Sequence, residues 1–259
     1  MISKPIAEGF KFAFSIKRMM PYMILNFLLL YDVFYMFGTV GSISSLTPEA
    51  IKSTASFFGI FITIIIAYLV FNPILFGTIT HQAKNFPKEI SIKKSFEFSI
   101  SVYFKTIAVA LILGIICGIA GFIPYLWPLV IGLLMCAFFY VLPAAIADNM
   151  KIKDSFKKSF AIFKEHVLQT VAVYIVVSAI TALLVVASFI PLFFWLFENT
   201  FSLISQGVKD ETVLVQNIAQ LLLSPMIIPF LLIPAFLTAF TSVMNIGIKT
   251  RLYFNLKKK

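Results

Sequence analysis

Six long runs of apolar residues constrain the fold of this chain more than any other feature of its sequence. A bilayer core about 30 Å thick is crossed by roughly 20 mostly apolar residues in a helix. Asp32 is the one charged residue within the six runs. The sequence therefore predicts an all-α polytopic membrane protein with six transmembrane helices. The predicted spans are Pro21 to Phe37, Phe57 to Thr80, Thr106 to Ile123, Leu126 to Ala147, Val167 to Leu196 and Leu221 to Ile248.

The composition excludes a soluble enzyme or a nucleic-acid-binding domain. Hydrophobic residues make up 60% of the 259 residues, against roughly 45–50% in soluble domains. Charged residues make up 12%, about half the usual share, and the mean hydropathy is +0.99. Such a chain has too few polar side chains to coat a globule. Because no soluble domain fits between the spans, we expect a single membrane domain over residues 1–259.

The basic residues are distributed very unevenly between the predicted loops. With the N-terminus inside, the four cytoplasmic segments hold four, five, five and five of the 21 Lys and Arg residues, and only Lys52 and Lys209 fall outside. Cytoplasmic loops carry such an excess, so we expect both termini in the cytoplasm and the chain in the cytoplasmic membrane. The net charge of +10 is then a topology signal, and no nucleic acid partner is expected. The basic N-terminus lacks a convincing cleavage site after the first apolar run, so we interpret that run as an uncleaved span.

A nine-residue pattern occurs three times, each time before an odd-numbered span. The copies are Ile6 to Phe14, Ile92 to Ile100 and Ile152 to Phe160. Their common form is Ile-x-x-(Gly/Ser)-Phe-(Lys/Glu)-x-(Ala/Ser)-(Phe/Ile). In the third copy, steps of four and three place the large apolar residues on one helical stripe and lysines on the other face. This pattern predicts a basic amphipathic helix in the cytoplasmic interface.

The residues expected to face anionic lipid headgroups are Lys11, Lys17, Arg18, Lys93, Lys94, Lys153, Lys157 and Lys158. Lysine and arginine near the membrane surface attract anionic lipids. The alternative is that the apolar stripes pack on the transmembrane helices, so that these segments serve as structural connections between spans. Such packing is compatible with contact between the lysines and lipid.

Each even-numbered span carries a proline in its cytoplasmic half: Pro73, Pro143 and Pro234. Proline removes an intrahelical hydrogen bond, so kinks are predicted at these positions. Together with the nine-residue pattern, the prolines predict three repeats, each made of an interfacial amphipathic helix followed by two spans. The repeat units cover approximately residues 1–87, 88–150 and 151–259.

One junction resembles a known family. Pro143 and Asp148, followed by Ser155, Ser159 and Lys164, resemble the proline, acidic residue, Ser-x-x-x-(Ser/Thr) and basic-residue signature of the membrane domain that accompanies some glycerophosphodiester phosphodiesterases. The chain is similar also to related six-span prokaryotic membrane families of undefined role. The resemblance implies a membrane module rather than hydrolysis, because the phosphodiesterase is a separate soluble barrel that no part of this chain could supply.

The sequence offers no constellation for catalysis or metal binding. With only two histidines, His81 and His166, a His-Glu-x-x-His zinc site is impossible, and neither a phosphate-binding loop nor a Gly-x-Ser-x-Gly elbow is present. The apolar setting of Cys117 and Cys136 indicates neither a disulfide framework nor a metal site. We therefore expect no enzyme, no catalytic or metal-binding residue and no cofactor, and an intramembrane enzyme is a disfavoured alternative.

Asp32 and Asn72 are the candidate polar residues within the spans. A charge near the centre of a membrane helix costs roughly 2.5–3.5 kcal/mol on insertion scales, so Asp32 should face protein or a water cavity. It either couples a proton or cation or forms a structural hydrogen bond. Asn72 could be its partner or could cap the carbonyl freed by Pro73.

The Gly114 to Gly118 pair allows close helix approach, for which packing within the chain is a better interpretation than dimerisation.

The sequence thus predicts a non-enzymatic integral membrane protein, transport-related or part of a membrane assembly, whose basic interfacial helices contact anionic lipid. An unidentified protein partner is a further candidate. The alternative function is a proton- or cation-coupled carrier that uses Asp32. Substrate, direction of transport and oligomeric state have no signal in the sequence.

Overall fold

The computed structural model describes residues 3–41, 48–122, 127–208 and 210–257, with no account of the side chains of 48–57 and 127. Two predicted span ends, Ile123 and Leu126, lie outside the described residues. So do the basic residues Lys209, Lys258 and Lys259 and the side chain of Lys52.

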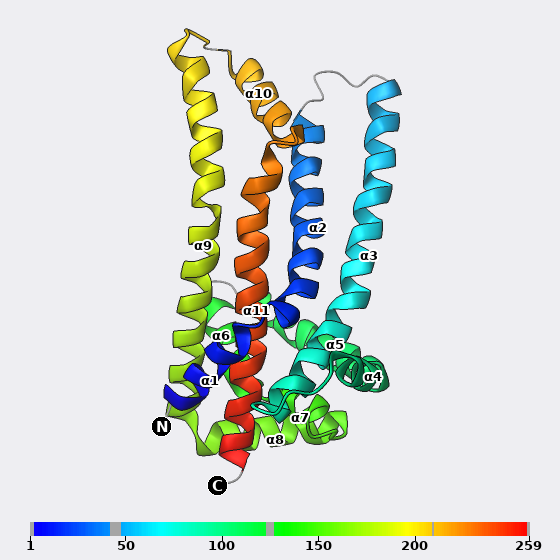
Figure 1. Ribbon diagram of the computed structural model, residues 1–259, viewed down its shortest axis with the longest axis vertical. Coiled ribbons are helices and arrows are strands. Elements are labelled where there is room, and N and C mark those ends of the chain that lie inside the picture. The colour runs from blue at the N-terminus through cyan, green and yellow to red at the C-terminus, as the bar shows by residue number, and fades with distance from the viewer. Residues whose placement is uncertain (1–2, 42–47, 123–126, 209, 258–259) are drawn as a thin grey trace. The chain divides into compact units, whose positions relative to one another are not determined.

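The described residues form eleven helices and no strand (Figure 1). The helices are α1 (Ser3–Ala13), α2 (Ile16–Gly41), α3 (Pro48–Asn85), α4 (Ile92–Ser101), α5 (Tyr103–Gly121), α6 (Trp127–Ala137), α7 (Val141–Ile146), α8 (Ile152–Glu165), α9 (Val167–Ser205), α10 (Glu211–Leu223) and α11 (Ile227–Lys257). The predicted all-α class is confirmed.

Six segments of the described chain are helical, long and apolar enough to cross a membrane. They are Ile16–Gly41, Phe58–Asn85, Tyr103–Gly121, Pro128–Ile146, Val167–Ser205 and Ile227–Lys257. The described residues therefore contain the predicted number of candidate spans, and these helices are compatible with a multi-pass integral membrane protein. Several helices extend beyond the predicted spans, because they continue into the polar residues that flank the apolar runs.

The fourth span is interrupted. α6 ends at Ala137 and α7 begins at Val141, with Pro143 in the first turn of α7. A proline ring clashes with the carbonyl four residues earlier, here that of Phe139, and lacks the N–H that would bond to it. The Ser159 hydroxyl bridges the interruption: it accepts a hydrogen bond from the Tyr140 N–H (3.1 Å) and donates one to the Ala137 carbonyl (2.9 Å). By contrast, α3 and α11 continue as helices through Pro73 and Pro234.

The sixth span begins later than the predicted Leu221. α10 ends at Leu223 because Ser224 precedes Pro225, and a residue before proline favours an extended backbone. Ser224 has φ −71° and ψ 141°, and its hydroxyl accepts a hydrogen bond from the Met226 N–H at 3.2 Å. α11 then starts at Ile227.

The chain divides into two compact units. The first contains Met1–Arg18, Phe71–Ile180 and Phe240–Lys259, and the second contains Met19–Val70 and Thr181–Ala239. The predicted single domain over 1–259 and its repeat units, 1–87, 88–150 and 151–259, stay predictions.

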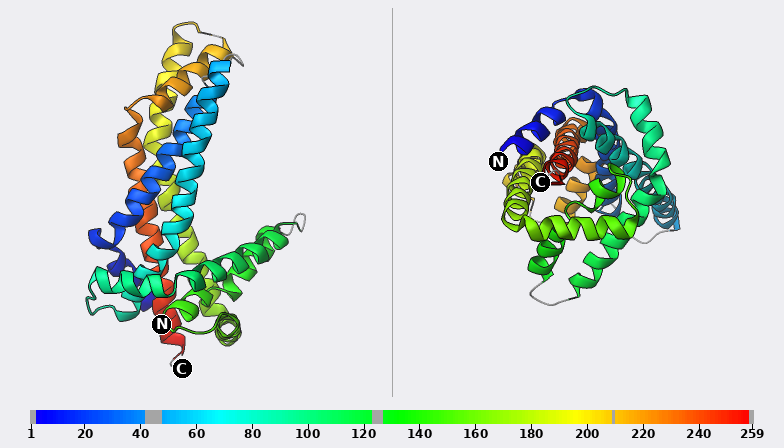
Figure 2. Two further views of the ribbon diagram at one scale, coloured as in Figure 1. Left: turned by 90° about the vertical axis from the view of Figure 1, so that its right-hand side faces the viewer. Right: turned by 90° about the horizontal axis from the view of Figure 1, so that it is seen from below.

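In the first unit, α5 lies beside α6 and α7, and α8 packs on α6 and α7 (Figure 2). Val109, Val141 and Ala145 form the fully buried centre of this packing. Tyr140 and Tyr253 are also fully buried. Because a buried phenol needs a hydrogen-bond partner, the 2.8 Å contact of the Tyr140 hydroxyl with Thr170 Oγ1 satisfies that group.

In the second unit, Leu192, Leu222, Ile227 and Leu231 form a buried apolar cluster, against which partly buried aromatic residues pack. These aromatic residues include Phe27, Tyr31, Phe34, Phe189, Trp195 and Phe230. The Trp195 and Phe230 rings stack with centroids 4.9 Å apart. Asn26 adds a polar contact, because its side-chain amide donates to Thr238 Oγ1 at 3.1 Å.

The helices that carry the nine-residue pattern bury their small residues. Gly9, Ser95 and Ser155 at the fourth position are buried, as are Ala13, Ser99 and Ser159 at the eighth. The large residue at the ninth position is exposed in every copy: Phe14 is 75%, Ile100 54% and Phe160 45% exposed. Small side chains let helix backbones approach closely. A Cβ on Gly9 would overlap Ile248 of α11, and the Ser99 hydroxyl donates to the Ile74 carbonyl of α3.

Many large apolar side chains on the candidate spans are exposed, and Leu183, Phe193 and Phe194 are each about 70% exposed on α9. In water such a surface would be an aggregation-prone patch, whereas hydrocarbon would solvate it. A Cβ placed on Gly114 or Gly118 would meet no atom within 4 Å. Within the described residues of the first unit, this glycine pair therefore makes no close helix contact, and the expected packing stays a prediction.

Candidate functional site

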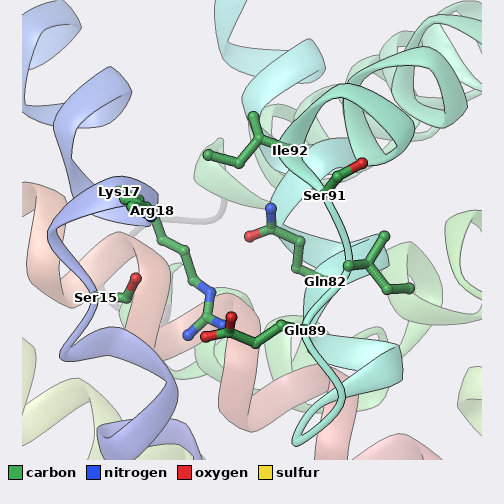
Figure 3. A pocket seen from close by; sticks show the side chains of 8 residues that line it. Ser15, Lys17, Arg18, Gln82, Glu89, Ser91 and Ile92 are labelled. Carbon is green, nitrogen blue, oxygen red and sulfur yellow. The ribbon is translucent and has the colours of Figure 1, made fainter.

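A cavity of about 380 Å³ lies in the first unit, where the beginnings of α2 and α4 meet the end of α3 (Figure 3). Ser15, Lys17 and Arg18 line it from the first turn of α2 and the residue before it. Ser91 and Ile92 line it from the beginning of α4, where Ser91 caps the helix by accepting a hydrogen bond from the Lys94 N–H. Two helix N-termini thus border one cavity, and helix N-termini favour anions.

Gln82 supplies the buried polar group of this cavity. Its side chain is only 6% exposed, and its Oε1 atom is buried without a hydrogen-bond partner among the described residues. Figure 3 shows the amide between the α2 side and the α4 side of the cavity. A buried acceptor without a donor costs about 1–3 kcal/mol, so a ligand that donates a hydrogen bond here would recover that energy.

Arg18 is held in place by the end of α1. Its Nη1 donates to the Phe12 carbonyl at 2.8 Å, and its guanidinium carbon lies 4.3 Å from the centre of the Phe12 ring. Glu89 lines the same cavity and interacts electrostatically with Arg18, and in Figure 3 the two side chains point toward the same space. An arginine has five N–H donors, so this one retains donors for a ligand.

A second polar cluster surrounds Asp148, directly after α7. The Tyr253 hydroxyl donates to Asp148 Oδ2 at 2.7 Å, and Lys257 forms an ion pair with the same oxygen. Burial raises the pKa of this carboxyl, but the hydrogen bonds from Lys257 and Tyr253 and the charges of Lys257 and Lys84 outweigh burial, so its pKa lies below the ordinary value. Lys84 also donates to the neighbouring Ala147 carbonyl at 2.6 Å.

A third cluster joins α1 to α11 and to the end of α3. Arg251 pairs with Glu8 at 2.7 Å and donates from Nη1 to the Phe86 carbonyl at 2.7 Å. Both side chains of the ion pair are about one-fifth exposed. Within each of these two clusters the charged side chains pair with one another. The clusters therefore hold helix ends together and offer few free charges to a ligand.

The basic residues expected to face lipid all lie in the described part of the chain, in the first unit. Six are exposed: Lys11, Lys17, Lys93, Lys94, Lys153 and Lys157. Arg18 and Lys158 are half-buried. Of this set, Lys17 and Arg18 are brought together at the cavity.

Asp32 lies in the second unit on α2 and is 3% exposed. Its Oδ2 atom has no hydrogen-bond partner among the described residues. Asn72 belongs to the first unit and is half-buried. The roles of both residues stay predictions.

Several cavity residues were not expected from the sequence, among them Gln82 and Glu89. Gln82 is a polar residue at the end of an apolar run, and Glu89 precedes the second copy of the nine-residue pattern by three positions. Their positions give a weak signal, because flanking polar residues are common at the ends of membrane helices.

Among the described residues, no group of three or more His, Cys, Asp or Glu side chains could hold a metal ion. Of the histidines, His81 contacts Ser95 Oγ through Nδ1 at 3.2 Å and stacks on Phe98 with ring centroids 4.4 Å apart. His81 therefore joins α3 to α4 in the described structure.

Comparison with known proteins finds no match: no family model, no curated protein and no solved structure is similar to this chain.

Proposed function

We propose that this chain is a non-enzymatic multi-pass protein of the cytoplasmic membrane that acts in transport or as the membrane component of a larger assembly. In this proposal both termini are cytoplasmic, and α1, α4 and α8 lie in the membrane interface with their basic residues against anionic headgroups. A protein partner in such an assembly is part of the same proposal.

The observation that carries this proposal is the mixed surface of the short helices. On α4, Ile92 and Ile100 are 47% and 54% exposed, while Lys93 and Lys94 are exposed on the same helix. In plain water the exposed isoleucines would be unfavourable, but at an interface they reach the acyl chains while the lysines stay among the headgroups.

The contacts of the buried small residues support the proposed threefold repeat. A Cβ on Gly9 of α1 would overlap Ile248 of α11, the Ser99 hydroxyl of α4 donates to the Ile74 carbonyl of α3 at 2.5 Å, and Ser159 of α8 binds the end of α6. Each short helix thus packs its small residues on a predicted even-numbered span that carries one of the three prolines.

A lipid-binding measurement tests the proposal. The purified full chain is reconstituted in nanodiscs with a defined fraction of anionic lipid, and lipid enrichment around the protein is measured at low and high salt. We expect enrichment of anionic lipid that weakens with salt, since charge-driven binding is screened. A variant with Lys93, Lys94, Lys153 and Lys157 replaced by Gln should lose most of that enrichment.

Replacement of Lys52 by Gln is the control, because Lys52 is predicted on the opposite side of the membrane, and it should leave the enrichment unchanged. Equal enrichment in the four-lysine variant and the wild type would contradict the proposed lipid contact.

A second candidate function is a proton- or cation-coupled carrier that uses Asp32. The observation in its favour is a carboxyl that is 3% exposed, with Oδ2 unpaired among the described residues. Buried acidic groups in membrane helices are costly and mark proton or ion pathways. Proteoliposomes with an imposed pH or cation gradient should show a flux above that of empty vesicles, which Asp32→Asn abolishes. Identical flux in wild type and variant would exclude this candidate.

The relation to the membrane domain that accompanies glycerophosphodiester phosphodiesterases is likewise a proposal. It rests on Pro143, Asp148, Ser155, Ser159 and Lys164. The genes adjacent to this one test it, because a neighbouring soluble phosphodiesterase would support the relation and a neighbouring ATPase would favour a transport assembly.

A further inference from the structure

We propose that the cavity at the beginnings of α2 and α4 binds the headgroup of a phospholipid that carries both a phosphate and a primary amine. This inference deepens the proposed function and rests on it, because it assigns one specific lipid site to a protein whose basic helices contact lipid.

The first step concerns the positive side of the cavity. Lys17 and Arg18 line it, and the N-termini of α2 and α4 border it. Arginine and lysine bind phosphate through charge-assisted hydrogen bonds, and the two helix ends add partial positive charge. These donors therefore suit the phosphate.

The second step concerns the acceptors of the same cavity. Glu89 brings a carboxylate, and Gln82 brings a buried Oε1 atom without a partner among the described residues. A ligand with phosphate alone would place its charge near these two acceptors and satisfy neither. A primary ammonium has three N–H donors, so it can bind both acceptors while the phosphate binds the cations.

The third step concerns size and surroundings. A volume of about 380 Å³ is near the small end of the range for ligand sites, which suits a headgroup rather than a whole lipid. Apolar residues beside the cavity are exposed: Phe14 by 75%, Ile16 by 70% and Ile92 by 47%. These side chains offer a surface for acyl chains, so the source of the headgroup is a membrane lipid rather than a soluble phosphoamine.

The test compares two lipids that differ only in the amine. Full-length protein is equilibrated with equal amounts of phosphatidylethanolamine and phosphatidylcholine, and the lipid retained after purification is quantified by native mass spectrometry. The trimethylammonium of phosphatidylcholine has no N–H, so it cannot donate to Gln82 or Glu89. We expect retention of phosphatidylethanolamine about tenfold above phosphatidylcholine, the ratio that one charge-assisted hydrogen bond supplies.

Variants assign the two halves of the headgroup to residues. Glu89→Gln should weaken the preference for phosphatidylethanolamine, because a neutral amide accepts a weaker hydrogen bond from an ammonium than a carboxylate does. Lys17→Gln should instead reduce retention of both lipids. Both residues are exposed, so the variants should fold, which size-exclusion chromatography and circular dichroism check. Glu97→Gln and Lys11→Gln are matched controls, because these exposed residues lie on α4 and α1 and do not line the cavity. They should retain the wild-type preference.

Three results would overturn the inference. Equal retention of the two lipids by the wild type would show that the site does not recognise the amine. Retention of phosphatidylglycerol at the same level, insensitive to Glu89→Gln, would show that the site binds a hydroxyl headgroup. Displacement of the lipid by free phosphoethanolamine at equal concentration would assign it to a soluble ligand. The proposed function is tested separately, by the enrichment of anionic lipid and by variants of lysines that do not line the cavity. Its failure is therefore distinguishable from each of these three results.

Discussion

The Tyr253 hydroxyl donates a 2.7 Å hydrogen bond to Asp148 Oδ2, although 105 residues separate the two along the chain. Tyr253 is fully buried, and Lys257, one turn further along α11, pairs with the same carboxylate oxygen. The carboxylate after α7 thus holds the end of α11 within the first unit.

This contact predicts a loss of stability in acid. The folded pKa of Asp148 lies below its ordinary value, so its stabilising contribution is fully present above the ordinary carboxyl pKa of about 3.9. It is lost as the pH falls through the lower folded pKa. Asp148→Asn should lower the melting temperature at pH 7, by the equivalent of about 1–2 kcal/mol, and should flatten the dependence of melting temperature on pH below about 4. Asp154→Asn, at an exposed position on α8, is the control and should change neither.

Ser159 predicts a large effect from the loss of one hydroxyl. It is fully buried and bonds both sides of the interruption between α6 and α7, at the Tyr140 N–H and the Ala137 carbonyl. Ser159→Ala should lower stability by about 1–3 kcal/mol, because it leaves buried polar groups unsatisfied.

Ser155→Ala is the matched control. Ser155 is equally buried, but its hydroxyl donates only to the Ile152 carbonyl of its own helix, at 2.6 Å. If thermal unfolding in detergent shows the two variants to be equally stable, Ser159 does not bridge the break.

Two glycines on predicted spans should respond oppositely to the same substitution. A Cβ on Gly77 would lie 2.5 Å from Ser99 Oγ, so Gly77→Ala forces α3 and α4 apart and should cost about 1–3 kcal/mol. Gly114→Ala meets nothing within 4 Å and should be neutral or stabilising by up to about 1 kcal/mol, because alanine is the better helix former. A marked destabilisation by Gly114→Ala would contradict this prediction and indicate that another helix packs on this face.

Cysteine labelling tests the proposed topology. In a background with Cys117 and Cys136 replaced by Ala, cysteines at Lys94 and Lys157 should react with a membrane-impermeant reagent only after the cell is permeabilised. A cysteine at Gln206, which is exposed between α9 and α10, should react in intact cells. Labelling of Lys94→Cys in intact cells would reverse the proposed orientation.

Local properties of the chain were enough to predict the six apolar helices, but not the separate helix α10. The six spans follow from runs of apolar residues, and Pro143 and Pro225 stand where helices are interrupted or end. The boundaries at Ile16 and Ser205 lie outside the predicted spans, because helical hydrogen bonds continue where hydropathy already falls. Of the cavity, Lys17 and Arg18 were expected at the membrane surface, but their meeting with Gln82 and Glu89 was not.

The sequence by itself determined the all-helical class, the six apolar helices and the basic short segments, because hydropathy and helical periodicity depend only on neighbouring residues. The tertiary structure decided which face of each short helix is buried. Ser155 and Ser159 are fully buried while Phe160 is 45% exposed, although phenylalanine is far more apolar, because a hydroxyl can bond a freed backbone group and a small side chain permits close approach. It also decided that Gln82 would be buried in a cavity that Lys17 lines as well, since contacts between distant segments depend on packing in three dimensions and leave no periodic trace in the chain.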